Sequence, residues 1–170
     1  MAKVVDLLET EYARRLARRR HPLLGSATIS VGVIKGGTQP NIVPDCCSIQ
    51  VDRRTLPGET EQGVLREIRD LLRSRRLEAT CLGDKAAPCL PLQTDVRRPL
   101  VAQFLRSAGQ RKPAGVHYFC DAAVLAQSGI PSIVFGPGDI AQAHTSDEWV
   151  SVAELERAQE MLDTFLRSLP

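Results

Sequence analysis

Residues 28–54, with the sequence TISVGVIKGGTQPNIVPDCCSIQVDRR, decide the fold of the first part of the chain. At its start, Ile29, Val31 and Val33 alternate with small residues. An alternation of this kind predicts a strand that is buried on one face, because successive side chains of a strand point to opposite sides. Gly36-Gly37 ends this strand.

A second strand is predicted from about residue 46 to residue 53. The side chains expected on its apolar face are Cys47, Ile49 and Val51. The opposite face carries Ser48, Gln50, Asp52 and Arg54. On the residues alone, Arg54 is most simply read as a surface arginine paired with Asp52.

Two helices are predicted around these strands. The first runs from about residue 2 to residue 20, with one apolar stripe, and His21-Pro22 ends it because the residue before proline leaves helical geometry. The second follows Pro57-Gly58. A third strand is expected from Leu77 to Leu82. This order predicts an α+β layer, with a small antiparallel sheet covered on one face by helices.

The second part of the chain has a different pattern. Prolines between residues 88 and 97 suggest a linker, and a helix is predicted from Leu100 to Ala108. Asp121 can cap a short helix that ends near Gly129. The last helix begins with a capping box made by Ser151 and Glu154.

The apolar run Ile133-Val134-Phe135 lies between these helices and predicts a strand buried on both faces of a parallel sheet. Such a strand needs neighbours on both edges and cover on both faces. About 75 residues cannot supply all of them, so we expect an incomplete α/β segment whose apolar strand is covered from elsewhere, for example by a second copy.

Composition narrows the functional classes. The chain has 170 residues, is 43% hydrophobic and carries a net charge of +2, which suits one compact domain or two small ones. No apolar stretch is long enough for a membrane span, and no export signal is recognisable, so a cytoplasmic protein is expected. The five cysteines form an odd set without metal-type spacing and are interpreted as reduced thiols. Clustered arginines near two helix ends are better explained as solvated side chains than as a nucleic-acid patch, so neither nucleic acid nor membrane is an expected partner.

Among the three histidines, His144 is the best candidate for a metal ligand. It follows the end of the predicted buried strand, where α/β sheets bind their ligands, although a capped loop histidine explains the local sequence equally well. His21 is expected to cap a helix end or lie on the surface, and His117 is expected in a strand. The chain contains no His-x-Asp or Glu-Glu pair, so its residues cannot complete a hydrolytic metal site.

Two motifs carry a family resemblance. The run from Gly36 to Asp45 with Asp52-Arg53-Arg54 resembles the lid signature of two-zinc amidohydrolases. That family includes acetylornithine deacetylase, succinyl-diaminopimelate desuccinylase, aminoacylase and carboxypeptidase G. The run from Phe135 to Asp139, followed by Ala143-His144-Thr145, resembles its C-terminal metal-ligand motif.

The resemblance implies roles for both parts. Residues 1–92 would form the lid, which dimerises, and residues 93–170 the end of the zinc-binding domain. Asn41 and Arg54 would bind the substrate carboxylate, Gly136 would line the pocket, and His144 would bind one of two zinc ions. Cobalt and manganese are alternatives, because ligand type discriminates poorly among these metals.

The same resemblance implies that most of the site is missing. The other metal ligands and the general base lie in an N-terminal half that this sequence lacks, and no residue of the chain is assigned as catalytic. We therefore expect part of an enzyme that cleaves N-acyl amino acids or peptides, inactive alone. The alternatives are a non-catalytic dimerisation or regulatory module, and a fragment that combines with a separate N-terminal half.

Overall fold

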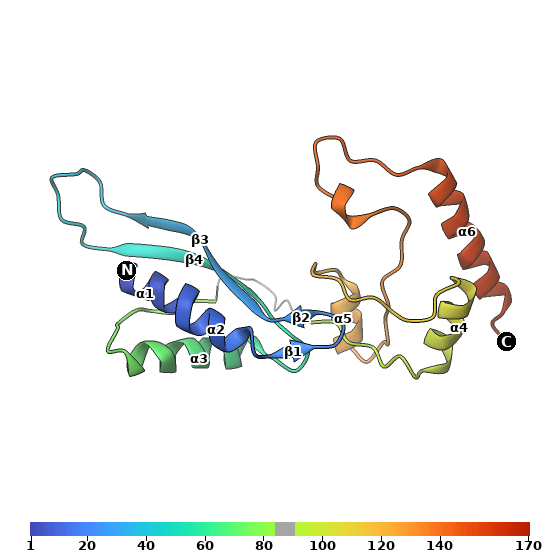
Figure 1. Ribbon diagram of the computed structural model, residues 1–170, viewed down its shortest axis with the longest axis horizontal. Helices are drawn as coiled ribbons and strands as arrows, with labels where there is room; N and C mark the ends of the chain where they lie inside the picture. Colours follow the sequence, from blue (N-terminus) through green and yellow to red (C-terminus); the bar gives the residue numbers. More distant parts are fainter. Residues whose placement is uncertain (84–90) are drawn as a thin grey trace. The chain divides into compact units, whose positions relative to one another are not determined.

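A computed structural model describes residues 1–83 and 91–170. The chain divides into two compact units (Figure 1). The first unit comprises Met1–Leu92 together with Gly115–Ala123, and the second comprises Gln93–Ala114 together with Val124–Pro170. Residues 88–90 of the predicted linker lie outside the described part. Residues 91–95 form no helix or strand. No helix in the described ranges is long and apolar enough to cross a membrane.

The first unit opens with a helix of three parts. They are α1 (Ala2–Asp6), the π-helical turn η1 (Leu7–Tyr12) and α2 (Ala13–Leu16). The predicted extension to residue 20 was wrong, because Arg20–His21 (β1) turns back and pairs antiparallel with Gly25–Ser26 (β2). The backbone groups near Pro22 are therefore paired in a short hairpin rather than in a last helical turn.

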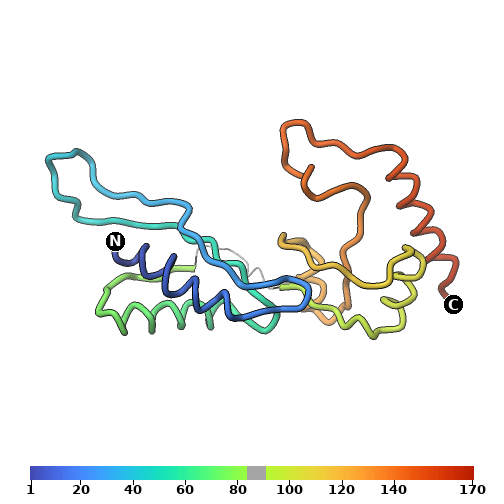
Figure 2. The backbone as a smooth tube through the Cα atoms, in the orientation of Figure 1, coloured from blue at the N-terminus to red at the C-terminus, as the bar shows by residue number. Residues whose placement is uncertain are grey.

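The two predicted strands are confirmed as β3 (Thr28–Gly36) and β4 (Cys47–Arg54). They pair antiparallel, from Thr28 opposite Arg54 to Gly36 opposite Cys47, with an irregularity between Val31 and Val33. Figure 2 shows the two strands running side by side to a wide loop at one end. This hairpin fixes which residues lie at which end of the first unit.

The core of the first unit lies between the hairpin and its helices. Helix α3 (Glu61–Ser74) begins at Thr60, whose hydroxyl oxygen accepts a hydrogen bond of 3.1 Å from the Gly63 amide. In Figure 1, α1, α2 and α3 lie on the same side of β3 and β4. The buried core residues are Val4, Leu7, Leu8, Tyr12, Leu16, Ala27, Leu56, Leu71 and Leu72. Small antiparallel sheets within a mixed α/β structure are thus confirmed.

The predicted strand from Leu77 to Leu82 was wrong. These residues form no strand, although Leu77 and Cys81 pack against the core of the first unit. Within the described ranges, β3 and β4 pair only with each other. The side chains of Leu77 and Cys81 therefore cover the core, although their backbone does not join the sheet.

The second unit is built around helices. They are α4 (Pro99–Ser107), α5 (Ala122–Gln127), whose first two residues belong to the first unit, the short 3-10 turn η2 (Ile140–Gln142) and α6 (Val152–Arg167). Phe104 of α4 makes edge-to-face contacts with Phe135 and Phe165, with ring centroids 5.0 and 5.1 Å apart. The N-cap half of the predicted capping box is confirmed, since the Ser151 hydroxyl accepts from the Glu154 amide at 3.2 Å. The Glu154 carboxylate accepts from the same hydroxyl at 3.0 Å rather than from the Ser151 backbone amide.

The apolar run Ile133-Val134-Phe135 does not form the predicted buried strand. The segment has no strand structure, and Ile133 and Val134 are 42% and 41% exposed. Phe135 is half-buried through its contact with Phe104. The described residues of this unit contain no strand with which the run can pair. Residues 133–135 are therefore irregular backbone, and the predicted strand was wrong.

Candidate functional site

Arg54 stands at the end of β4 on its outward face. Its side chain is 57% exposed, and its Nη2 contacts Asp52 Oδ2 at 2.8 Å. Its Nη1 donates a hydrogen bond of 3.2 Å to the backbone oxygen of His117. A guanidinium has five N–H donors, so donors remain for a ligand while these two contacts persist.

The neighbouring Arg53 points into the unit and is anchored by Glu59. The Arg53 side chain is only 7% exposed, lies over the Tyr12 ring, and contacts Glu59 Oε1 at 2.8 Å. Glu59 also binds Arg19 at 2.8 Å and accepts the Leu56 amide at 2.9 Å. The end of β4, and with it the position of Arg54, is therefore tied to the core by charge-assisted hydrogen bonds.

These contacts set the pKa of Glu59. Burial by itself raises the pKa of this carboxyl, but the Leu56 amide and the guanidinium groups of Arg19 and Arg53 together outweigh it. The pKa of Glu59 is consequently held below its ordinary value. The role of Glu59 was not foreseen from the sequence. One signal in the sequence could have revealed this role. Arg53 shares a strand face with apolar Ile49 and Val51, and a cation on a buried face needs a carboxylate partner.

Asn41 lies in the exposed loop that joins β3 and β4. This loop begins beyond Gly36 and Cys47, at the end of the hairpin opposite Arg54. The seven steps from Cys47 to Arg54 span about 23 Å at the usual rise of a strand. One chain therefore does not bring the side chains of Asn41 and Arg54 to the same small ligand.

Gly136 and His144 lie in the second unit, in the loop around η2. Gly136 is exposed, and a β-carbon there would meet no atom within 4 Å. His144 has φ 63°, in the left-handed region that residues other than glycine seldom adopt. Its backbone amide donates a hydrogen bond of 3.0 Å to Glu148 Oε2, which supports this conformation.

The other two histidines have local roles. His21 is half-buried in β1, and its Nδ1 accepts the Leu23 amide at 3.2 Å; it caps no helix end, because α2 ends at Leu16. His117 is exposed and lies in an irregular segment, so the predicted strand at this position was wrong. The backbone oxygen of His117 accepts the hydrogen bond from Arg54 Nη1.

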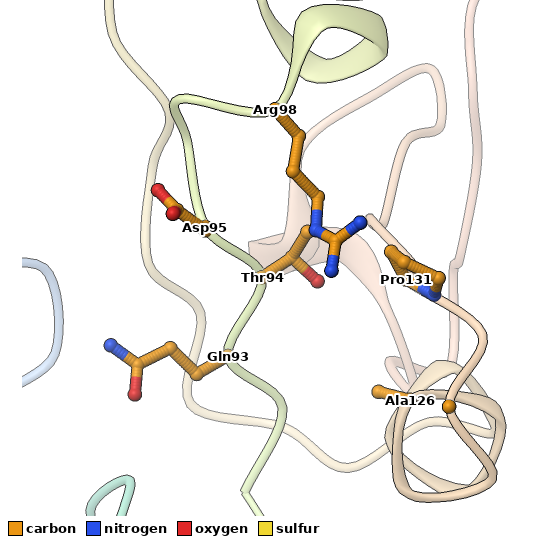
Figure 3. A pocket seen from close by; sticks show the side chains of 7 residues that line it. Gln93, Thr94, Asp95, Arg98, Ala126 and Pro131 are labelled. Atoms are coloured by element: carbon orange, nitrogen blue, oxygen red, sulfur yellow. The ribbon is translucent and has the colours of Figure 1, made fainter.

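The second unit also contains a small open cavity of about 270 Å³. Figure 3 shows the Arg98 guanidinium beside Pro131, whereas the Asp95 carboxylate extends to the opposite side. Asp95 contacts Arg97 at 3.0 Å, and this hydrogen bond lowers the pKa of Asp95. The cavity is lined by neither Gly136 nor His144, so it is separate from the loop that the sequence singled out.

Comparison with known proteins identifies the family. Residues 1–80 match the peptidase dimerisation domain of the M20 family. Acetylornithine deacetylase of Proteus mirabilis is 32% identical over 176 residues, which cover 99% of this chain and 44% of that protein. The corresponding enzyme of Myxococcus xanthus is 33% identical over 140 residues, or 79% of this chain and 36% of that protein. The chain belongs to the M20 family.

Other M20 proteins extend the comparison. N-acetyl-L-citrulline deacetylase of Xanthomonas campestris is 29% identical over 163 residues, covering 92% of this chain and 43% of that protein. The crystal structure of an M20 metallo-carboxypeptidase from Sulfolobus solfataricus superposes with a TM-score of 0.63 at 17% identity. That superposition covers 98% of this chain and 45% of the other, and shows a shared fold. The chain spans less than half the length of these M20 relatives.

The dimerisation-domain match lies in the first unit, whereas the candidate metal ligand His144 lies in the second. The dimerisation-domain match includes Asn41 and Arg54, and it ends before the second unit begins. We tested whether the second unit could hold the metal that the name of the Sulfolobus protein implies. In residues 1–83 and 91–170, no three His, Cys, Asp or Glu side chains are grouped to bind an ion. The described residues do not fit a complete metal centre, and we assign no catalytic step to one.

Proposed function

We propose that this chain is the dimerising and substrate-binding part of an M20 amidohydrolase that acts on an N-acyl amino acid. In this proposal Arg54 and Asn41 bind the substrate carboxylate, Gly136 lines the pocket, and His144 supplies one metal ligand. Zinc is the metal proposed, with cobalt or manganese as alternatives. The single observation that supports the proposal most is the outward Arg54 guanidinium, held between Asp52 and His117 within the dimerisation-domain match.

The substrate class follows from two kinds of support. The deacetylases named above are named for acetylornithine and N-acetyl-L-citrulline, and both of these compounds carry a free α-carboxylate. A planar guanidinium binds a carboxylate through two parallel hydrogen bonds, which an ammonium group cannot reproduce. Arg54 offers such a fork at an exposed position, and an asparagine amide can add one further donor.

The separation of Asn41 and Arg54 favours a homodimer. Since about 23 Å of strand separates the two ends of the hairpin, both residues can reach one carboxylate only if two chains contribute. A domain whose relatives are named for dimerisation suits such an arrangement. We therefore propose that Asn41 of one chain and Arg54 of another share a ligand in a symmetric dimer.

Replacing Arg54 by alanine should weaken binding of N-acetyl-L-ornithine by about tenfold, which corresponds to the loss of one charge-assisted contact. Asp52→Asn should strengthen binding severalfold, because it removes the negative charge 2.8 Å from the guanidinium while the asparagine oxygen still accepts a hydrogen bond from Arg54 Nη2. Isothermal titration of the folded variants measures both effects. Arg73→Ala, at an exposed arginine with a 3.6 Å ion pair, is the matched control. Equal affinities for Arg54→Ala and Arg73→Ala would contradict the proposal.

The chain with added zinc should not hydrolyse N-acetyl-L-ornithine, because the described residues offer His144 but no neighbouring set of ligands. Turnover that disappears in His144→Ala would show this expectation to be wrong. Zinc titration should give no tight stoichiometric site for the chain alone. It should give two ions when a polypeptide with the remaining M20 ligands is added.

A non-catalytic dimerisation or regulatory module is the second candidate. It is favoured because the described residues place no group of three His, Cys, Asp or Glu side chains around His144. Such a module would take up no stoichiometric zinc even with the added polypeptide. The same titration therefore separates the two proposals.

A further inference from the structure

One short segment of the chain packs on the first unit although its neighbours in sequence belong to the second. Gly115–Ala123 groups with Met1–Leu92, while residues 93–114 and 124–170 form the other unit. The segment carries His117, whose backbone oxygen is 3.2 Å from Arg54 Nη1. An interaction between residues 63 positions apart in sequence thus reaches the side chain that we propose as the carboxylate-binding group.

At Gly115 the backbone of this segment lies directly against Leu23 of the first unit. A β-carbon at position 115 would lie 2.7 Å from the carbonyl carbon of Leu23 and 2.9 Å from its β-carbon, and closer still to its carbonyl oxygen. The neighbouring atoms are largely backbone and cannot move aside as a flexible side chain would. Only glycine lets the segment lie at this distance from Leu23.

The contact with His117 and the contact with Asp52 hold the Arg54 guanidinium at two different nitrogens. Nη1 is bound to the His117 oxygen and Nη2 to Asp52 Oδ2 at 2.8 Å. A planar group fixed at two nitrogens cannot rotate freely about its Cζ–Nε bond. It therefore presents its remaining N–H groups in one orientation before a ligand arrives, which is preorganisation for an anion.

We infer that the segment beginning at Gly115 positions Arg54 for carboxylate binding, and that the small size of Gly115 makes this possible. Gly115 and His117 act through Arg54 and need not touch the ligand. The inference rests on the proposed role of Arg54 in binding, but the positioning itself can be measured without any ligand. By linkage, Arg54 should in turn hold the segment on the first unit.

Gly115→Ala tests the inference, with Gly32→Ala as its matched control. Gly32 lies in the same unit, and a β-carbon there would meet nothing within 4 Å. In ¹⁵N-labelled protein, the Nη signals of Arg54 should show restricted rotation in the wild type and in Gly32→Ala, and averaged signals in Gly115→Ala. Arg53, anchored independently on Glu59, should keep its signals in all three proteins. Affinity for N-acetyl-L-ornithine should fall about three- to tenfold in Gly115→Ala alone.

A second variant covers the case in which Gly115→Ala does not fold. Lysine offers its donors from a single nitrogen on a shorter side chain, whereas Asp52 and the His117 oxygen bind two different nitrogens of Arg54. Arg54→Lys should therefore loosen the segment and speed chymotryptic cleavage after Tyr118 and Phe119. The two aromatic side chains are already 39% and 47% exposed. Wild-type cleavage rates in Arg54→Lys would overturn the inference, as would unchanged Arg54 signals in a folded Gly115→Ala. Restricted Arg54 signals without any N-acetyl-L-ornithine binding would instead contradict the proposed function while leaving the positioning intact.

Discussion

Replacing Glu59 by glutamine should lower the free energy of unfolding of the first unit by about 3 kcal/mol, the lower end of the cost of breaking a buried ion pair. Glutamine keeps the shape of the side chain but removes the charge. The Arg53 guanidinium, only 7% exposed, would then lose its carboxylate partner. Arg19 would keep its other contact, with Glu67 at 2.9 Å. Urea unfolding followed by amide exchange in β3 and β4 measures the change.

The control for this variant is Asp70→Asn, which removes an exposed ion pair of 3.6 Å with Arg73. It should change stability by no more than about 0.5 kcal/mol. The single tryptophan, Trp149, lies in the second unit, and its fluorescence should report the same unfolding of that unit in all variants. A Glu59→Gln protein as stable as Asp70→Asn would contradict the role of Glu59.

The same variant has a defined pH dependence. The pKa of Glu59 in the folded protein lies below its ordinary value of 4.5. The ionised carboxylate therefore contributes its full stabilisation above that value, and the contribution is lost as the pH falls through the lower folded pKa. The difference in stability between wild type and Glu59→Gln should be constant above about pH 5 and should shrink as the pH falls further. A difference that grows on acidification would be the wrong sign.

Leu16→Ala should lower the stability of the first unit by about 3 kcal/mol, because it removes three heavy atoms from a closely packed site and leaves a cavity. Leu16 is fully buried, at the end of α2 where the helix meets β3. The matched control is Val43→Ala in the hairpin loop, where the side chain is 90% exposed and should matter little. Equal unfolding midpoints for the two variants in urea would show that the core does not depend on Leu16.

The sequence was most informative where a segment and the residues that form hydrogen bonds with it lie close together in the sequence. The alternation of Ile29, Val31 and Val33 predicted β3 because β4 follows nearby and supplies its hydrogen bonds. The capping box of α6 was predicted because Ser151 and Glu154 interact within one helical turn. Such local and short-range signals need no information about distant segments.

The failures involve hydrogen-bonding partners that a pattern cannot supply. Leu77–Leu82 and Ile133–Phe135 both have the apolar character of strands, but a strand also requires a neighbour in register. Among the described residues neither segment has one. The end of the first helix was missed for the converse reason, because Arg20–His21 found an unforeseen partner in Gly25–Ser26.

The arrangement of the candidate site could not be predicted from the sequence. The family resemblance assigned Asn41 and Arg54 to the same carboxylate, and these roles remain proposals. The wide loop between β3 and β4 places them at opposite ends instead. The contact between Arg54 and His117 could not be foreseen either, because it joins segments far apart in sequence.

The length of the β3–β4 hairpin has a genetic consequence. Suppose that each chain contributes Asn41 to one ligand site and Arg54 to another. A substitution at Asn41 then damages a site whose Arg54 comes from the other chain of the dimer. Two alleles, one defective at Asn41 and one at Arg54, would then restore one intact pair whenever their products associate. After a gene duplication, the two copies would stay dependent on each other for as long as their products mixed.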